Sequence, residues 1–152
     1  MRFWRMFLMA IMGCALLSLP AAAQHPNDGS FTFFGGALLG SPSGFGGGVG
    51  LGIPLTTNAS FEPTVALGRS GHSNVFTLDG SFVYNFHLPD SGIVPYVLGG
   101  VGLAQWGGST HGSPIIGIGA RFPLGGDTWI RPEIRAADHG LSRFTIGITK
   151  TF

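Results

Sequence analysis

Residues 142–152 read Ser-Arg-Phe-Thr-Ile-Gly-Ile-Thr-Lys-Thr-Phe, and this stretch decides the class of fold. Apolar side chains occupy every second position with Lys150 as the interruption, whereas the positions between them carry Arg143, Gly147 and threonines. A period of two residues predicts a β-strand with one apolar face and one small or polar face. Such a strand either lines a water-soluble core or faces lipid, and the rest of the chain has to distinguish the two.

Seven further segments alternate in the same way and are separated by turn residues such as glycine, proline, serine and aspartate. In the second of them, one face consists almost entirely of glycine. The facing of the fifth remains open because Gly99, Gly100 and Gly102 interrupt its alternation. Together with 142–152, the segments predict an all-β fold of eight strands, the first seven at 30–39, 44–55, 60–69, 74–88, 93–106, 114–124 and 128–137.

Residues 1–23 differ from the rest and resemble a secretory signal peptide. Arg2 and Arg5 precede an apolar run over 6–19, and the segment ends in Ala-x-Ala at Ala23. We therefore expect cleavage after Ala23 and one domain over 24–152. A membrane-spanning helix is the alternative, but Pro20 and the small residues after it favour cleavage.

Cys14 is the only cysteine and lies inside this predicted signal. Residues 11–14 are weakly similar to a lipoprotein acceptor site, but the apolar run continues past Cys14 to Leu19. After cleavage no thiol would remain, which would exclude disulfides, cysteine metal sites and cysteine nucleophiles.

The charge of the predicted mature chain gives no reason to expect a nucleic-acid partner. Without Arg2 and Arg5, six basic side chains stand against seven acidic ones, a formal charge of −1. Charged residues make up 10% of the whole chain, compared with about 25% in an average globular protein. After residue 23, no apolar run approaches the length of a membrane-spanning helix.

Side-chain volume distinguishes the two ways of folding such strands. An eight-stranded barrel has an interior only about wide enough for side chains. The apolar set would overfill that interior, because it includes Phe45, Phe61, Phe76, Phe82, Tyr84, Phe86, Phe122, Phe144 and Phe152. The opposite set, rich in glycine and threonine, fits it. The sequence therefore predicts an antiparallel up-and-down transmembrane β-barrel with its apolar face toward lipid, and a secreted soluble barrel is the alternative.

These patterns resemble the small outer-membrane β-barrel superfamily, which includes the opacity-type and OmpA/OmpX-type barrels. The similarity rests on the signal, the eight alternating segments, Val-Pro-Tyr-Val-Leu-Gly-Gly-Val-Gly at 94–102, Arg-Pro-Glu-Ile-Arg at 131–135 and the terminal Phe152. It implies secretion across the inner membrane and integral insertion, as a monomer, among outer-membrane lipid and lipopolysaccharide. It also implies contact between the barrel assembly machinery and the C-terminal strand, through Phe144, Ile146, Ile148 and Phe152.

All predicted turns are short, whereas the outward loops of that superfamily are usually the longer set. This departure weakens the expectation of loop-borne adhesion.

The inward alternate set carries charged residues, with His87 expected near the periplasmic end. Buried charges must pair, because an unpaired buried charge is strongly unfavourable. We therefore expect a lumen plugged by ion pairs, with a gate or narrow ion path as the alternative. The candidates are Glu62, Asp79, Arg121, Arg131, Glu133, Arg135 and Arg143.

His72, His111 and His139 fall in three predicted turns that share one end of the barrel, and Asp138 is adjacent to the last. They could form a metal-binding or protonation-sensitive rim. Their spacing contains no ligand motif, so independent polar turn residues are the favoured interpretation, and we expect neither a metal nor a cofactor.

His111-Gly112-Ser113 has a His-x-Ser spacing that resembles the outer-membrane lipid A deacylases, which use serine, histidine and an acid. The nearest following carboxylate outside a turn is Glu133, a whole strand away, and the rest of that motif is absent. The sequence therefore favours a non-enzymatic structural or opacity-like surface protein. A deacylase-like hydrolase and a narrow ion channel are the alternatives.

Overall fold

The computed structural model describes residues 28–40, 43–88, 91–138 and 142–152. The predicted signal and its cleavage site lie outside these residues. Among the described residues, no helix has the length and apolar character needed to cross a membrane.

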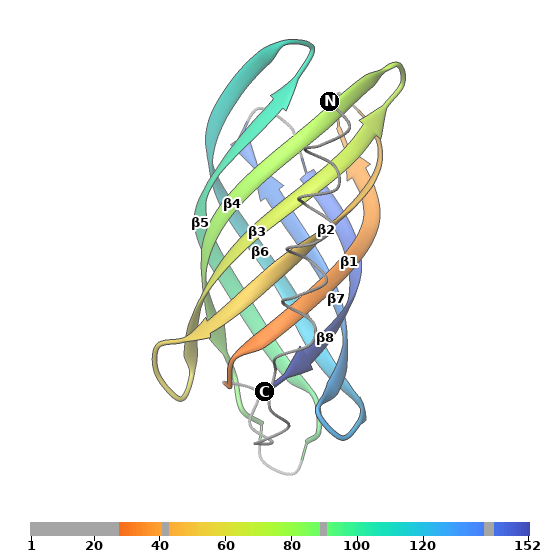
Figure 1. Cartoon of the computed structure of the whole chain (residues 1–152). Coiled ribbons are helices and arrows are strands. Elements are labelled where there is room, and N and C mark those ends of the chain that lie inside the picture. The colour runs from red at the N-terminus through yellow and green to blue at the C-terminus, as the bar shows by residue number, and fades with distance from the viewer. Residues whose placement is uncertain (1–27, 41–42, 89–90, 139–141) are drawn as a thin grey trace, which may run out of the picture.

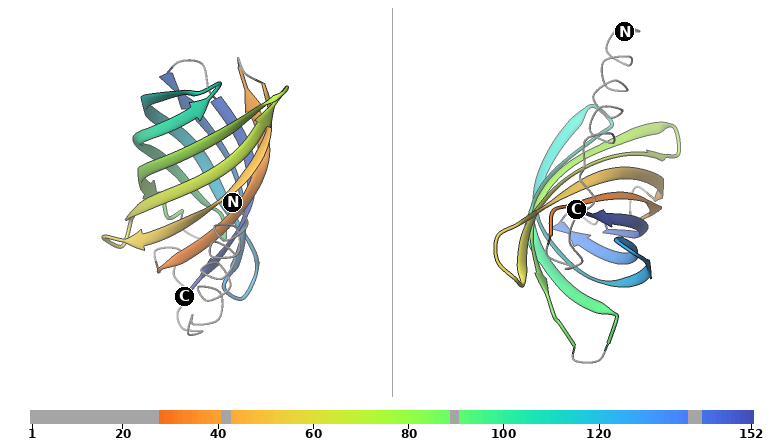
Figure 2. Two further views of the ribbon diagram at one scale, coloured as in Figure 1. Left: turned by 45° about the horizontal axis from the view of Figure 1, so that its top comes forward. Right: turned by 60° about the horizontal axis from the view of Figure 1, so that its bottom comes forward.

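Eight antiparallel strands close into a barrel in which each strand pairs with its neighbours in sequence and β8 pairs with β1 (Figure 1). This confirms the predicted eight-stranded up-and-down architecture. Further views show the strands inclined around a common axis (Figure 2). The strands are β1 (Ser30–Leu39), β2 (Gly44–Pro54), β3 (Ala59–Ser70), β4 (Ser73–Asn85), β5 (Val94–Trp106), β6 (Ser109–Gly125), β7 (Thr128–Ala137) and β8 (Ser142–Thr151).

Two strand boundaries differ from the sequence prediction by more than one residue. Strand β4 ends at Asn85, three residues early, because the chain beyond it reaches Pro95 of β5, which has no N–H to continue the ladder. Strand β6 begins at Ser109, five residues before the predicted start. Gly107 and Gly108 both have positive φ angles, 57° and 83°, and so form a tight hairpin turn that keeps Trp106 and Ser109 paired.

Polar and apolar residues separate between the inside and the outside of the barrel. Threonines and charged residues at alternate positions are buried in the lumen. The outer wall is apolar on every strand, with charged Arg69 and Lys150 close to strand ends. Exposed members of this wall, one from each strand, are Phe33, Leu51, Leu67, Phe82, Val101, Ile116, Ile134 and Ile148.

The lumen also contains apolar side chains. Val83, Tyr96, Leu98 and Ile115 form a buried cluster. This settles the open facing of β5, because its even-numbered residues from Val94 to Leu98 are buried.

Inward glycines allow neighbouring strands to approach closely where the sheet bends. A Cβ atom on Gly36 would overlap the carbonyl oxygen of Phe144 on β8, and one on Gly100 would overlap that of Gly80 on β4. Glycine at such positions supplies the curvature that a narrow closed barrel needs.

Both described ends of the chain lie at the same end of the barrel. Phe152 donates its N–H to the carbonyl of Gly29 at 2.8 Å. The β2–β3 and β6–β7 turns lie at this end, whereas the β3–β4 and β5–β6 turns lie at the other (Figure 1). We call these the terminal end and the far end.

Candidate functional site

The candidate site is a network of buried charges in the lumen, supplied mainly by one strand. Strand β7 directs Arg131, Glu133 and Arg135 inward because alternate residues of a strand share a face. Across the barrel, β3 supplies Glu62 and β4 supplies Asp79, and all five side chains are buried.

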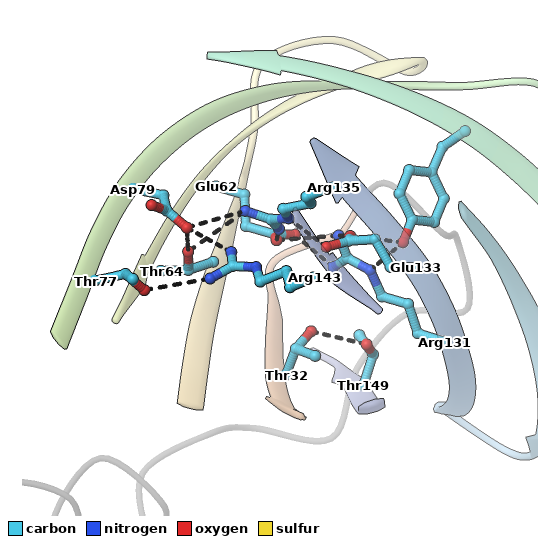
Figure 3. Close-up of polar contacts among 11 residues, drawn as sticks. Thr32, Glu62, Thr64, Thr77, Asp79, Arg131, Glu133, Arg135, Arg143 and Thr149 are labelled. Carbon is cyan, nitrogen blue, oxygen red and sulfur yellow. Dashed lines mark hydrogen bonds and ion pairs between the residues drawn. The ribbon is translucent and has the colours of Figure 1, made fainter. Parts of the chain in front are cut away.

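Arg131 and Glu62 form the centre of the network (Figure 3). The two guanidinium Nη atoms of Arg131 donate to the two carboxylate oxygens of Glu62, at 2.5 and 3.0 Å. Nη2 of Arg131 also donates to Glu133 Oε2 at 2.5 Å, and its Nε donates to the Tyr96 hydroxyl at 2.6 Å. The Tyr96 hydroxyl in turn donates to Glu133 at 2.8 Å. This bidentate geometry holds both partners in fixed orientations.

Arg135 links this centre to a second group of charges toward the far end. Its Nη2 donates to Glu62 Oε1 at 2.9 Å, its Nε donates to Glu133, and its Nη1 lies 3.6 Å from Asp79 Oδ2. Asp79 also accepts hydrogen bonds from Arg143 and from Thr64, the latter at 3.1 Å.

Three carboxylates and three arginines therefore balance within one connected network. Arg121, the seventh predicted member, lies over the Tyr96 ring, with its Cζ atom 5.4 Å from the ring centroid. All seven predicted residues are thus in the lumen, and ion pairs join at least six of them.

Among the described residues, three cavities inside the barrel border the network, and all three are small. Their volumes are about 30, 20 and 10 Å³, so each holds on the order of one or two water molecules. Between the described residues, the lumen at the level of the network is filled by side chains.

The histidine rim, which the sequence offered as the less favoured alternative, is not tested, because one of its three members lies outside the described residues. His72 is exposed in a turn, and His139 lies outside the described residues. His111 is within β6 instead of the predicted turn, and its ring stacks on Trp106 with centroids 4.5 Å apart. In the part of the chain that the structure describes, no three histidine, cysteine or acidic residues are grouped to hold a metal ion.

His87 lies near the terminal end of the barrel, but it is exposed and not inside the lumen as expected. It lies beyond the end of β4, is exposed, and has its Nδ1 3.4 Å from the Asn58 side-chain amide.

His111 and Ser113 face inward, on the same alternate set of β6 as the buried Ile115. Both line the cavity of about 30 Å³, which Asp138 and Arg143 line as well. His111, Ser113 and Asp138 therefore surround the mouth of the lumen and do not lie on the apolar outer wall, whereas Glu133, the acid considered from the sequence, belongs to the buried network.

The C-terminal strand presents its predicted apolar residues to the outside. Phe144, Ile146 and Ile148 are exposed on the outer wall, and Phe152 is half-buried just beyond β8. On the inward side, the hydroxyls of Thr149 and Thr32 are hydrogen-bonded at 2.7 Å across the β1–β8 closure (Figure 3).

Sequence reasoning missed Tyr96, and it placed threonines inside the barrel without assigning them contacts in the network. Thr64 and Thr77 contact Asp79 and Arg143, respectively. Tyr96 could have been placed inward from the outward alternation of Val97, Val101 and Leu103, despite the glycines between them.

Comparisons with known proteins identify the fold. No protein-family model and no curated protein matches the sequence. The N-terminal β-barrel domain of Pseudomonas aeruginosa OprF is 20% identical, with a TM-score of 0.66, over 85% of this chain and all of that domain. Neisserial surface protein A (NspA) is 14% identical, with a TM-score of 0.63, over 86% of this chain and all of that protein.

The outer membrane enzyme PagL also matches, at 14% identity and a TM-score of 0.53, over 80% of this chain and 99% of that one. The chain therefore has the fold of small eight-stranded outer-membrane barrels, a fold that the enzyme PagL shares with NspA and OprF.

Proposed function

We propose that this protein is an integral outer-membrane barrel with a closed lumen, acting as a structural or opacity-like surface protein without catalysis. The observation that carries the proposal is an apolar outer wall around a lumen that is filled by a charge-balanced network. An apolar exterior suits lipid, and a closed barrel leaves no backbone edge unpaired in it. In this proposal its partners are outer-membrane lipid, lipopolysaccharide and the barrel assembly machinery.

Membrane fractionation followed by gel electrophoresis of unboiled and boiled samples tests the location. We expect an outer-membrane band whose mobility shifts on boiling, because a closed barrel resists unfolding by detergent. A soluble band without a shift would contradict the proposal and would favour the secreted soluble barrel.

Conductance in planar bilayers tests the closed lumen. We expect no steady current from the wild-type protein, because the cavities beside the network hold only a few water molecules. Reproducible single-channel steps would support the narrow ion channel instead.

A lipid-modifying hydrolase is the second candidate, and the shared cavity of His111, Ser113 and Asp138 is the observation in its favour. The inward orientation of His111 and Ser113 argues against this candidate, because the acyl bond of a lipid would have to enter the mouth of the lumen. We expect mass spectra of lipid A from cells with wild-type protein and with the Ser113→Ala variant to match. A modified lipid A that depends on Ser113 would overturn the non-catalytic proposal.

A further inference from the structure

The outer wall contains a groove of about 450 Å³, far larger than any cavity beside the charge network. It crosses β5, β6 and β7, where three outward residues, Pro95, Ala120 and Pro132, are small. The inward residues Tyr96, Gly119 and Glu133 also border it. Larger apolar side chains line most of the rest, among them Phe86, Ile118, Phe122, Ile134 and Phe144.

Two prolines interrupt the backbone ladder in this groove. Phe86 donates its N–H to the carbonyl of Pro95 at 2.8 Å, so residue 95 directs its backbone polar groups toward residue 86. Pro95 has no N–H to return to the carbonyl of Phe86.

The second interruption follows from the alternation of hydrogen-bonded pairs. Since Pro95 bonds toward β4, its other neighbour Ala120 directs its polar groups away from it, toward Pro132 on β7. The β6–β7 ladder accordingly passes from the pair Gly119–Glu133 to the pair Phe122–Ile130. The carbonyl of Ala120 lacks the donor that any residue other than proline would supply.

The setting determines what can supply the missing donor. A backbone carbonyl in hydrocarbon without a donor is costly, by several kcal/mol. The carbonyl of Phe86 lies beyond the end of β4, near the rim, whereas Ala120 lies within the wall. An occupant of the groove thus needs an apolar chain for the walls and one hydrogen-bond donor for Ala120.

We propose that this groove binds the hydroxylated acyl chain of a membrane lipid, whose hydroxyl donates to the Ala120 carbonyl. The inference rests on the proposed membrane location, because only then does the groove face acyl chains. It adds to that proposal a specific site and a preference for one chemistry of chain.

Native mass spectrometry of the folded full chain in detergent, with equal amounts of β-hydroxymyristic acid and myristic acid, tests the preference. One hydrogen bond predicts an adduct ratio of about threefold to tenfold in favour of the hydroxylated acid. In parallel, the carbon-13 signal of the Ala120 carbonyl should shift with the hydroxylated acid and not with myristic acid.

Three variants separate the groove from the rest of the wall. Ala120→Phe should abolish both adducts by filling the groove, whereas Ala136→Phe, the same change at an exposed alanine outside the groove, should leave them unchanged. Pro132→Val restores an N–H opposite Ala120, so it should keep both adducts and remove the preference.

Equal adducts of the two acids in the wild type, or equal losses in the two phenylalanine variants, would overturn the inference. The mobility shift on boiling verifies that each variant is folded. If a variant is not folded, the carbon-13 shift of the Ala120 carbonyl in the wild-type protein tests the inference instead. A heat-modifiable outer-membrane barrel without the preference would refute this site alone, whereas a soluble location would refute the proposed function.

Discussion

At the scale of single residues, Glu62 is the side chain on which the lumen network depends. It is 2% exposed and accepts hydrogen bonds from two arginines, Arg131 and Arg135. A buried ion pair adds little net stability compared with an apolar core, but removing one partner leaves an uncompensated buried charge.

We therefore predict that Glu62→Gln lowers the free energy of unfolding by about 3–5 kcal/mol. The matched control is Asp127→Asn, because Asp127 lies 3.7 Å from Lys150, whose side chain is 59% exposed. Surface pairs of this kind contribute about 0–1 kcal/mol. Urea unfolding of both variants in lipid vesicles measures the difference, and equal losses would mean that the network does not stabilise the barrel.

At the scale of elements, the closure between β1 and β8 depends on which face each glycine occupies. A Cβ on Gly36 would overlap the backbone of β8, as described above. Gly35 on β1 is also paired with a residue of β8, Ile146, but it faces outward. A Cβ atom on Gly35 would have its nearest neighbour, the carbonyl oxygen of Gly46, at 3.7 Å.

We predict that Gly36→Ala reduces the yield of folded, heat-modifiable barrel and lowers its unfolding midpoint, because a backbone carbonyl cannot move aside as a side chain can. Gly35→Ala should leave both unchanged or slightly improved, since alanine is less flexible in the unfolded chain. Electrophoresis after refolding in detergent compares the two variants. Similar yields would show that the closure between β1 and β8 tolerates a wider spacing of the two strands than the structure has.

At the scale of the whole molecule, an even number of strands brings both described ends of the chain to the terminal end. If that end is periplasmic, the β3–β4 turn faces the outside and the β2–β3 turn faces the periplasm. Ser73 and Thr57 are exposed next to or within these turns.

We predict that a membrane-impermeant maleimide labels Ser73→Cys on intact cells and labels Thr57→Cys only after the outer membrane is permeabilised. The parent protein measures any background from Cys14. The reverse pattern would show that the barrel is inserted with the opposite orientation, and labelling of both on intact cells would argue against a membrane barrel.

The sequence by itself determined the strand content, the number of strands and the alternate set that carries the buried charges. Each depends on properties that are local along the chain: a period of two residues and the volume of side chains. Glu62 and Arg131 could be placed inside on that basis. Leu98 could not, because Gly99, Gly100 and Gly102 interrupt the alternation of its strand.

Only the tertiary structure decided which charges meet. Arg131 and Glu62 are 69 positions apart, and their contact depends on the register of every strand pair around the closed barrel. A slip of two residues in one strand keeps every side chain on its face but moves it by about 7 Å along the strand, beyond the reach of an ion pair. The ion pairs in the lumen and the placement of Pro95 and Pro132 on either side of Ala120 are therefore properties of the closed barrel. No single strand carries the information that aligns them.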